Sequence, residues 1–228
     1  MTTDSHSRPA DPAARVRLAA TLLCVVAVAG MVGEWLQLYR GLLRQLIGAA
    51  STCYLLIALA GRTTRPRYQG WMVTALGFCW LGDMLGPRHF LTGVVMFFLA
   101  HVGLIGAFIA GGIQRRNLRV SLAVIALLGG AAAWLIVPHV PIAQRPFILV
   151  YSVALIAMLG VAGGTIGVGA QRLIPIAALA FFVSDLCLAQ TAFFRGSVAW
   201  TYSGYPLYYA ACLLFAWSVS DRAAGSTA

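Results

Sequence analysis

Three acidic side chains fall inside long apolar stretches of this sequence. The chain has only six Asp and Glu residues, and Glu34, Asp83 and Asp185 are each surrounded by apolar neighbours. A charged side chain at the centre of a bilayer costs about 2.5–3.5 kcal/mol on insertion scales, so such acids predict a site that faces the interior of a helix bundle. Two carboxyls in one low-dielectric site can supply an acid and a negative charge together, because desolvation and mutual repulsion keep one protonated while the other stays ionised.

The composition places these acids in a membrane protein. Of the 228 residues, 61% are hydrophobic and 10% are charged, whereas a soluble domain is about 45–50% apolar and about 25% charged. The sequence contains eight apolar segments, 16–38, 42–60, 69–86, 90–113, 118–137, 146–168, 173–194 and 204–220. Since a spanning helix needs about 20 apolar residues, we expect an all-α polytopic membrane protein with eight transmembrane helices.

The distribution of arginine predicts the orientation of the chain. All 16 basic residues are Arg, and eleven of them fall on the N-terminal side of the membrane against five on the other. This asymmetry predicts that both termini are cytoplasmic. We expect a disordered cytoplasmic tail over 1–14, one transmembrane domain over 15–221 and a short tail over 222–228, in a bacterial plasma membrane.

The positive charge also indicates which kinds of partner the protein binds. The net charge of +10 comes from Arg residues in the breaks between apolar segments, as topology and anionic lipid headgroups require. No basic stripe or stacking platform accompanies it, so we expect membrane lipids and no nucleic acid as partners.

Two segments in the second half of the chain are similar in sequence to two segments in the first half. Residues 75–83 resemble 178–185, and both stretches end in a small residue followed by Asp. The segments that follow are also similar, over 93–101 and 204–212. The pattern predicts a parallel repeat of the third and fourth helices as the seventh and eighth, with a site at the repeat interface. Asp83 and Asp185 would then face each other.

His101 is a candidate third member of the site, either to activate water or to orient an Asp. A core histidine bonded to a backbone carbonyl is the alternative. Together with Asp83, His89 and His139 it could also form a zinc site, because imidazole and carboxylate suit Zn²⁺. No paired histidine spacing supports this, and we expect neither a metal nor another cofactor.

The motifs around the two aspartates resemble those of the YhhN-type membrane proteins, the lysoplasmalogenase family. Leu81-Gly82-Asp83 with Phe97-x3-His101 is similar to a first acidic signature, and Phe182-Val183-Ser184-Asp185 is similar to a second. Tyr151-x4-Ile156-x-Met158 and Tyr208-Tyr209-x-Ala211 match two further helices. Members commonly carry Lys-Pro at the start of the second helix. This chain has no Lys, and Arg40 or Arg44 is the candidate substitute.

The resemblance implies hydrolysis of the vinyl ether bond of a lysoplasmalogen, a lysophospholipid, to a fatty aldehyde and a glycerophospho-alcohol. The catalytic residues would be Asp83, Asp185 and His101. The substrate-binding residues would be Glu34, Tyr151, Ser184, Tyr208, Arg88 and Arg195, of which either Arg could hold the lipid phosphate. A proton-coupled transporter, a lipid-binding membrane protein and a hydrolase of another lysolipid are the alternative functions.

The glycines of the sixth segment leave a further alternative open. Gly160, Gly163, Gly164, Gly167 and Gly169 could form an unwound stretch of the kind that transporters use. Gly163 and Gly167 also fit the spacing of a tight helix-packing face.

Overall fold

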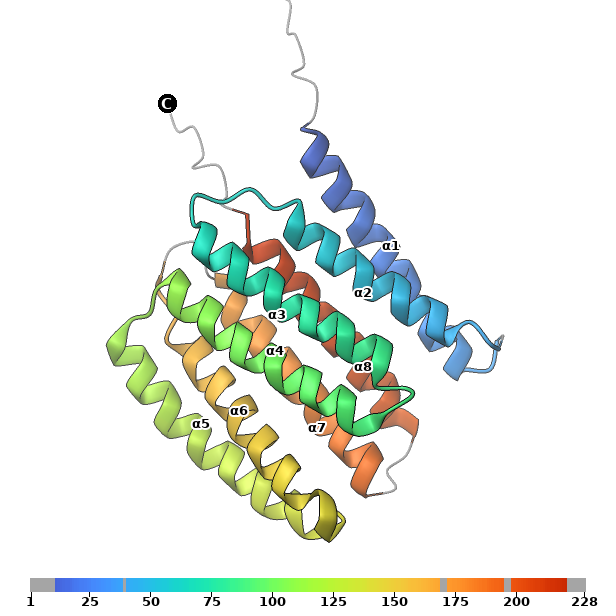
Figure 1. Ribbon diagram of the computed structural model, residues 1–228, viewed down its shortest axis with the longest axis vertical. Helices are drawn as coiled ribbons and strands as arrows, with labels where there is room; N and C mark the ends of the chain where they lie inside the picture. The colour runs from blue at the N-terminus through green and yellow to red at the C-terminus, as the bar shows by residue number, and fades with distance from the viewer. Residues whose placement is uncertain (1–10, 39, 169–171, 195–197, 221–228) are drawn as a thin grey trace, which may run out of the picture.

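The computed structural model describes residues 11–38, 40–168, 172–194 and 198–220. These residues form helices and contain no strand, which confirms the all-α class (Figure 1). The α-helices are α1 (Pro12–Trp35), α2 (Leu43–Leu59), α3 (Pro66–Leu85), α4 (Phe90–Gly111), α5 (Arg115–Ile136), α6 (Arg145–Gly163), α7 (Leu173–Phe193) and α8 (Val198–Ser218). Two short 3-10 helices, η1 (Val137–His139) and η2 (Ile142–Gln144), connect α5 to α6.

Six of the helices form a closed ring. Each helix contacts the next in the order α2, α3, α4, α6, α7 and α8, and α8 contacts α2 to close the ring. Helix α1 packs outside the ring against α2 and α8, and α5 packs outside it against α6, at opposite edges of the molecule (Figure 1). The interior of the ring is therefore the place where polar side chains are hidden from lipid.

Five of the described helices are long and apolar enough to cross a membrane: α1, α4, α7, and the stretches Arg115–His139 and Ile142–Gly163 that contain α5 and α6. Helix α2 is apolar but has only 17 residues. Helices α3 and α8 carry polar side chains such as Asp83 and Tyr208, which reduces their mean hydropathy. The expected eight helices are present, and the expectation that all eight span the membrane remains a prediction for α2, α3 and α8.

Several helix boundaries differ from those expected. Helix α1 begins at Pro12, inside the predicted tail, because the Asp11 carboxylate accepts a hydrogen bond from the Ala13 amide at 3.1 Å and Pro suits the first turn. Residues 1–10 of the predicted N-terminal tail and the whole predicted C-terminal tail, 222–228, lie outside the described residues, as does residue 221. Helix α6 ends at Gly163 rather than at 168, and α8 begins at Val198 rather than at 204.

Of the five glycines singled out in the sequence, Gly160 and Gly163 lie in α6 and form a packing face, Gly164 and Gly167 lie in the turn beyond its end, and Gly169 lies outside the described residues. A Cβ added at Gly160 would lie 2.7 Å from Leu122 of α5, and one at Gly163 would overlap Ser121 of the same helix. Gly164 follows the last helical residue, and Gly167 has a φ of +84° in the turn beyond it. The small residues thus allow α5 and α6 to approach closely.

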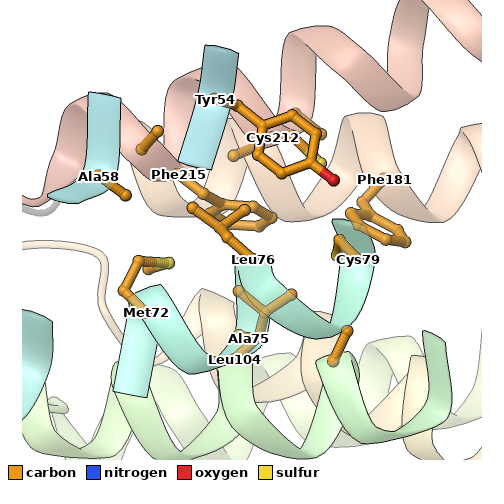
Figure 2. Close-up of a cluster of buried hydrophobic side chains, with 14 of the residues drawn as sticks. Tyr54, Ala58, Met72, Ala75, Leu76, Cys79, Leu104, Phe181, Cys212 and Phe215 are labelled. Atoms are coloured by element: carbon orange, nitrogen blue, oxygen red, sulfur yellow. The ribbon is translucent and has the colours of Figure 1, made fainter. Parts of the chain in front are cut away.

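A buried cluster fills the ring on the side of the two termini. Figure 2 shows Leu76 of α3 and Phe215 of α8 at its centre, with Tyr54 and Cys212 above them and Phe181 of α7 beside them. Each of these five side chains is fully buried. The cluster fixes the spacing of four ring helices around the site described below.

The contact between the start of α1 and the end of α8 closes the same end of the bundle. The Arg17 guanidinium donates to Ser220 Oγ and to the Trp217 carbonyl, and it stacks at 4.0 Å on the Trp217 ring. Both ends of the helical region therefore lie on one side of the molecule. This agrees with an even number of crossings, while the side of the membrane remains a prediction.

Gly93 of α4 permits the closest approach between α3 and α4. A Cβ added there would lie 2.7 Å from the Gly86 Cα. We expect Gly93→Ala to destabilise the protein by about 1–3 kcal/mol, measured as a lower melting temperature in detergent. The matched control is Gly77→Ala in α3, where no atom lies within 4 Å of an added Cβ. Its stability should be unchanged or raised by up to about 1 kcal/mol, and equal losses in both variants would contradict this packing.

Candidate active site

A cavity of about 510 Å³ lies inside the ring, within the range of small-molecule sites. It is formed by α2, α3, α4, α7 and α8, and it extends to the turn between α3 and α4. Most of its lining is apolar. The polar side chains that line it are Arg44, Asp83, Ser184, Asp185, Thr191 and Tyr208, with the aromatic residues Trp200 and Tyr205. Both aspartates predicted from the sequence therefore face one cavity.

Asp83 lies on α3 within a cluster of three hydroxyl groups. Its Oδ2 accepts hydrogen bonds from Ser51 Oγ at 2.5 Å, Tyr208 Oη at 2.9 Å and Tyr54 Oη at 3.1 Å. The Tyr54 and Tyr208 hydroxyls are themselves 3.3 Å apart, and the Tyr209 hydroxyl lies 3.5 Å from Ser51 Oγ. Donors converging on one oxygen stabilise negative charge on this carboxyl.

Asp185 lies on α7 in a different environment. Its Oδ2 accepts one hydrogen bond, from Tyr151 Oη at 2.7 Å, and lies 3.6 Å from His101 Nε2. The His101 ring packs edge-on against Tyr151 and Phe181, with centroids 5.1 and 5.0 Å away. His101 is fully buried and lines neither this cavity nor the second one described below. Within the described part of the chain neither ring nitrogen of His101 has a hydrogen-bond partner, so its ring lies near Asp185 without being hydrogen-bonded to it.

Aromatic rings separate the two carboxyl groups. The Tyr208 ring packs edge-on against Phe97 and Phe181, with centroid distances of 5.7 and 5.4 Å. Phe181 in turn packs edge-on against His101. In the described part of the chain no hydrogen bond joins the two carboxyls directly. Each carboxyl is hydrogen-bonded to hydroxyl groups of its own, and both line the large cavity.

A second cavity of about 100 Å³ adjoins the first between α4, α6 and α7. Asp185 lines both cavities. Tyr151, which the sequence assigns to substrate binding, lines the second cavity, while Ser184 and Tyr208 line the first.

Glu34 and Arg88, two other predicted binding residues, line neither cavity. Glu34 accepts hydrogen bonds from the backbone amides of Gly41 and Leu42, both at 2.9 Å, and so holds the α1–α2 loop. Arg88 is exposed in the turn after α3 and lines neither cavity. Arg195 lies outside the described residues. The cationic side chain that lines the large cavity is Arg44, one of the two candidate substitutes for the family's Lys.

Residues proposed for the alternative zinc site are dispersed. His139 bonds to the Leu135 carbonyl and packs against Phe194, whereas His89 is exposed before α4. Across 11–38, 40–168, 172–194 and 198–220, no group of three or more His, Cys, Asp or Glu side chains is placed to hold a metal ion.

Ser51 and Tyr54 are the site residues that the sequence analysis missed. They lie on α2 with Arg44 and Ile47, at spacings of three or four residues that place all four on one helix face. Such a polar stripe within an apolar helix was a usable signal. Which residues this stripe contacts could not be inferred, because Ser51 meets Asp83 through the packing of α2 on α3 and meets Tyr209 only through closure of the ring.

Comparison with known proteins identifies the family. The family model described as YhhN matches residues 43–219, from the first residue of α2 to just past the end of α8. A search of curated proteins and a search of solved structures found no match. The matched region covers the whole ring and both aspartates and leaves out α1. The chain therefore belongs to the YhhN family, as its motifs indicated.

Proposed function

We propose that this protein is an integral membrane hydrolase that cleaves the vinyl ether bond of lysoplasmalogens. The observation that carries the proposal is the pair of aspartates, Asp83 and Asp185, that line one largely apolar cavity inside the ring. Membership of the YhhN family is consistent with a hydrolase. A cavity lined by apolar residues, two acids and an Arg suits a lipid with a polar, anionic end.

Hydrolysis of a vinyl ether needs a positioned acid and a nearby negative charge. A proton is added to the carbon of the double bond that does not carry the ether oxygen, and the π electrons of the double bond form the new C–H bond. The oxygen-bearing carbon becomes an oxocarbenium ion, which water attacks. The attacking water loses a proton, and the resulting hemiacetal breaks into a fatty aldehyde and the free glycerol hydroxyl. The slow step is expected to be the first proton transfer, which general acid catalysis accelerates about 10²–10⁴-fold.

We assign the two carboxyls different roles. Asp83, with three hydroxyl donors on Oδ2, is the negative charge that stabilises the cation. Asp185, with one donor and a place at the junction of both cavities, is the acid that protonates carbon and regains a proton from the attacking water. His101 and Tyr151 position Asp185.

A comparison of three lipids tests the proposal. Purified protein should release fatty aldehyde from a 1-alkenyl lysophospholipid, and should release nothing from its 1-alkyl analogue. Release of fatty acid from a 1-acyl lysophospholipid, without aldehyde from the alkenyl lipid, would instead indicate a hydrolase of another lysolipid. Binding of all three without any product would indicate the carrier or lipid-binding alternative.

The hydroxyl cluster around Asp83 gives a matched pair of variants. We expect Tyr208→Phe to lower kcat about tenfold, because it removes a hydrogen bond to a charged group. Tyr209→Phe should lower kcat much less, since its hydroxyl reaches Ser51 and not Asp83. Steady-state aldehyde release would measure both, and equal losses would contradict a specific role for the Tyr208 hydroxyl.

A further inference from the structure

Asp185 occupies the junction between the large cavity and the smaller one. The two cavities also share Phe90, Val94, Phe97 and Leu188, which form a common apolar wall from α4 and α7. A molecule that reaches Asp185 from the large cavity therefore has a second space open beside the carboxyl group.

The second cavity is suited to hydrocarbon. Its lining is apolar apart from Asp185, Ser152 and Tyr151, and the Tyr151 hydroxyl is already bonded to Asp185. On α7 it is bounded by Ala189 and Ala192, whose small side chains leave the space open. Apolar surface of this kind favours an alkyl chain through the hydrophobic effect.

Arg44 provides the opposite chemistry in the large cavity. Its side chain is exposed, and within the described part of the chain it has no hydrogen-bond or ion-pair partner. It lies one turn before Ile47 and seven residues before Ser51, which contacts Asp83. Seven residues correspond to about 10 Å along a helix, a span that a glycerol backbone and an extended Arg side chain can bridge. An unpaired guanidinium there suits a phosphate group.

We infer that the substrate lipid is divided between the two cavities, with its phosphate at Arg44 in the large cavity and the start of its hydrocarbon chain, next to the vinyl ether, in the α4–α6–α7 cavity. In a lysoplasmalogen the vinyl ether joins the headgroup to the chain, so this placement brings the bond to be broken to Asp185. The inference rests on the proposed function for the identity of the lipid. Beyond that function, it assigns recognition of the chain to the α4–α6–α7 cavity and recognition of the headgroup to Arg44.

Binding of lipids that cannot be hydrolysed tests the placement without relying on turnover. The probes are octyl and ethyl 1-O-alkyl lysophosphatidylethanolamine and uncharged octylglycerol, titrated against the full chain in nanodiscs. Ala189→Phe fills the second cavity, and Ala189→Leu is a milder version in case the larger side chain impairs folding. The control is Ala126→Phe, at an exposed position of α5 that lines neither cavity.

We expect wild type to prefer octyl over ethyl lipid, and Ala189→Phe to reduce that preference about tenfold, which corresponds to displacing roughly two methylene groups. Ala126→Phe should keep the preference. Arg44→Gln should weaken both phospholipids about tenfold and leave octylglycerol unchanged. An unchanged chain preference in both Ala189 variants, or equal weakening of all three probes in Arg44→Gln, would overturn the placement.

The proposed function and this placement can fail separately. Aldehyde release by wild type together with an unaltered chain preference in the Ala189 variants overturns the placement alone. The expected binding pattern without aldehyde from any alkenyl lipid supports the placement and overturns the proposed function.

Discussion

Asp185→Asn is expected to lower kcat for aldehyde release by about 10²–10⁴-fold, because the amide cannot donate the proton that general acid catalysis requires. The KM should change little, since Asn is nearly isosteric and the cavity wall is preserved. Its oxygen can still accept the 2.7 Å hydrogen bond from Tyr151. The measurement is steady-state kinetics on a 1-alkenyl lysophospholipid.

The control for this variant is Asp11→Asn, which neutralises an exposed carboxyl at the start of α1, far from the cavity in sequence. Its contacts among the described residues are an ion pair with Arg62 and a hydrogen bond from the Ala13 amide. It should retain full activity. Wild-type kcat in Asp185→Asn, with an unchanged melting temperature, would show that Asp185 is not the acid.

Asp83→Asn is expected to lower kcat by about 10²–10³-fold, the range for loss of one preorganised electrostatic contact to a developing charge. The three hydroxyls of Ser51, Tyr54 and Tyr208 would then surround a neutral group, and the oxocarbenium ion would lose its counter-charge. The fold should survive, because replacing a buried charge by a neutral group of the same shape removes a desolvation penalty.

Thermal denaturation distinguishes this effect from damage to the ring. We expect the melting temperature of Asp83→Asn to equal or exceed that of the parent. A lower melting temperature that accounts for the activity loss, or a kcat equal to that of wild type, would contradict the electrostatic role of Asp83.

The sequence was sufficient for the helical class, the number of helices and the family, because apolar segments and short polar breaks are local features. It also predicted that Asp83, Asp185 and Tyr208 share a site, since intramembrane acids must face a protein interior. The family match over residues 43–219 confirms the resemblance carried by these motifs.

The remaining parts of the site depend on how the ring closes. Ser51 and Tyr54 reach Asp83 across the neighbouring helices α2 and α3. Tyr208 and Tyr209 join them only because α8 packs on α2, a contact between residues far apart in the chain. Arg88 follows an Asp-bearing helix and was therefore a reasonable phosphate ligand, but the turn after α3 places it at neither cavity, while Arg44 lines the large cavity from α2. Glu34 could not be separated from a site acid, because its bonds to loop amides arise only in the folded α1–α2 connection.

The most direct test of the paired-carboxyl account is single-turnover aldehyde release by the parent, Asp83→Asn, Asp185→Asn and the double variant, in preparations of equal thermal stability. If the carboxyls act together on one reacting bond, each single variant loses at least about 10²-fold, and the double variant is little slower than the slower single one. Full activity in both single variants would contradict the account, as would losses that multiply in the double variant as independent effects do.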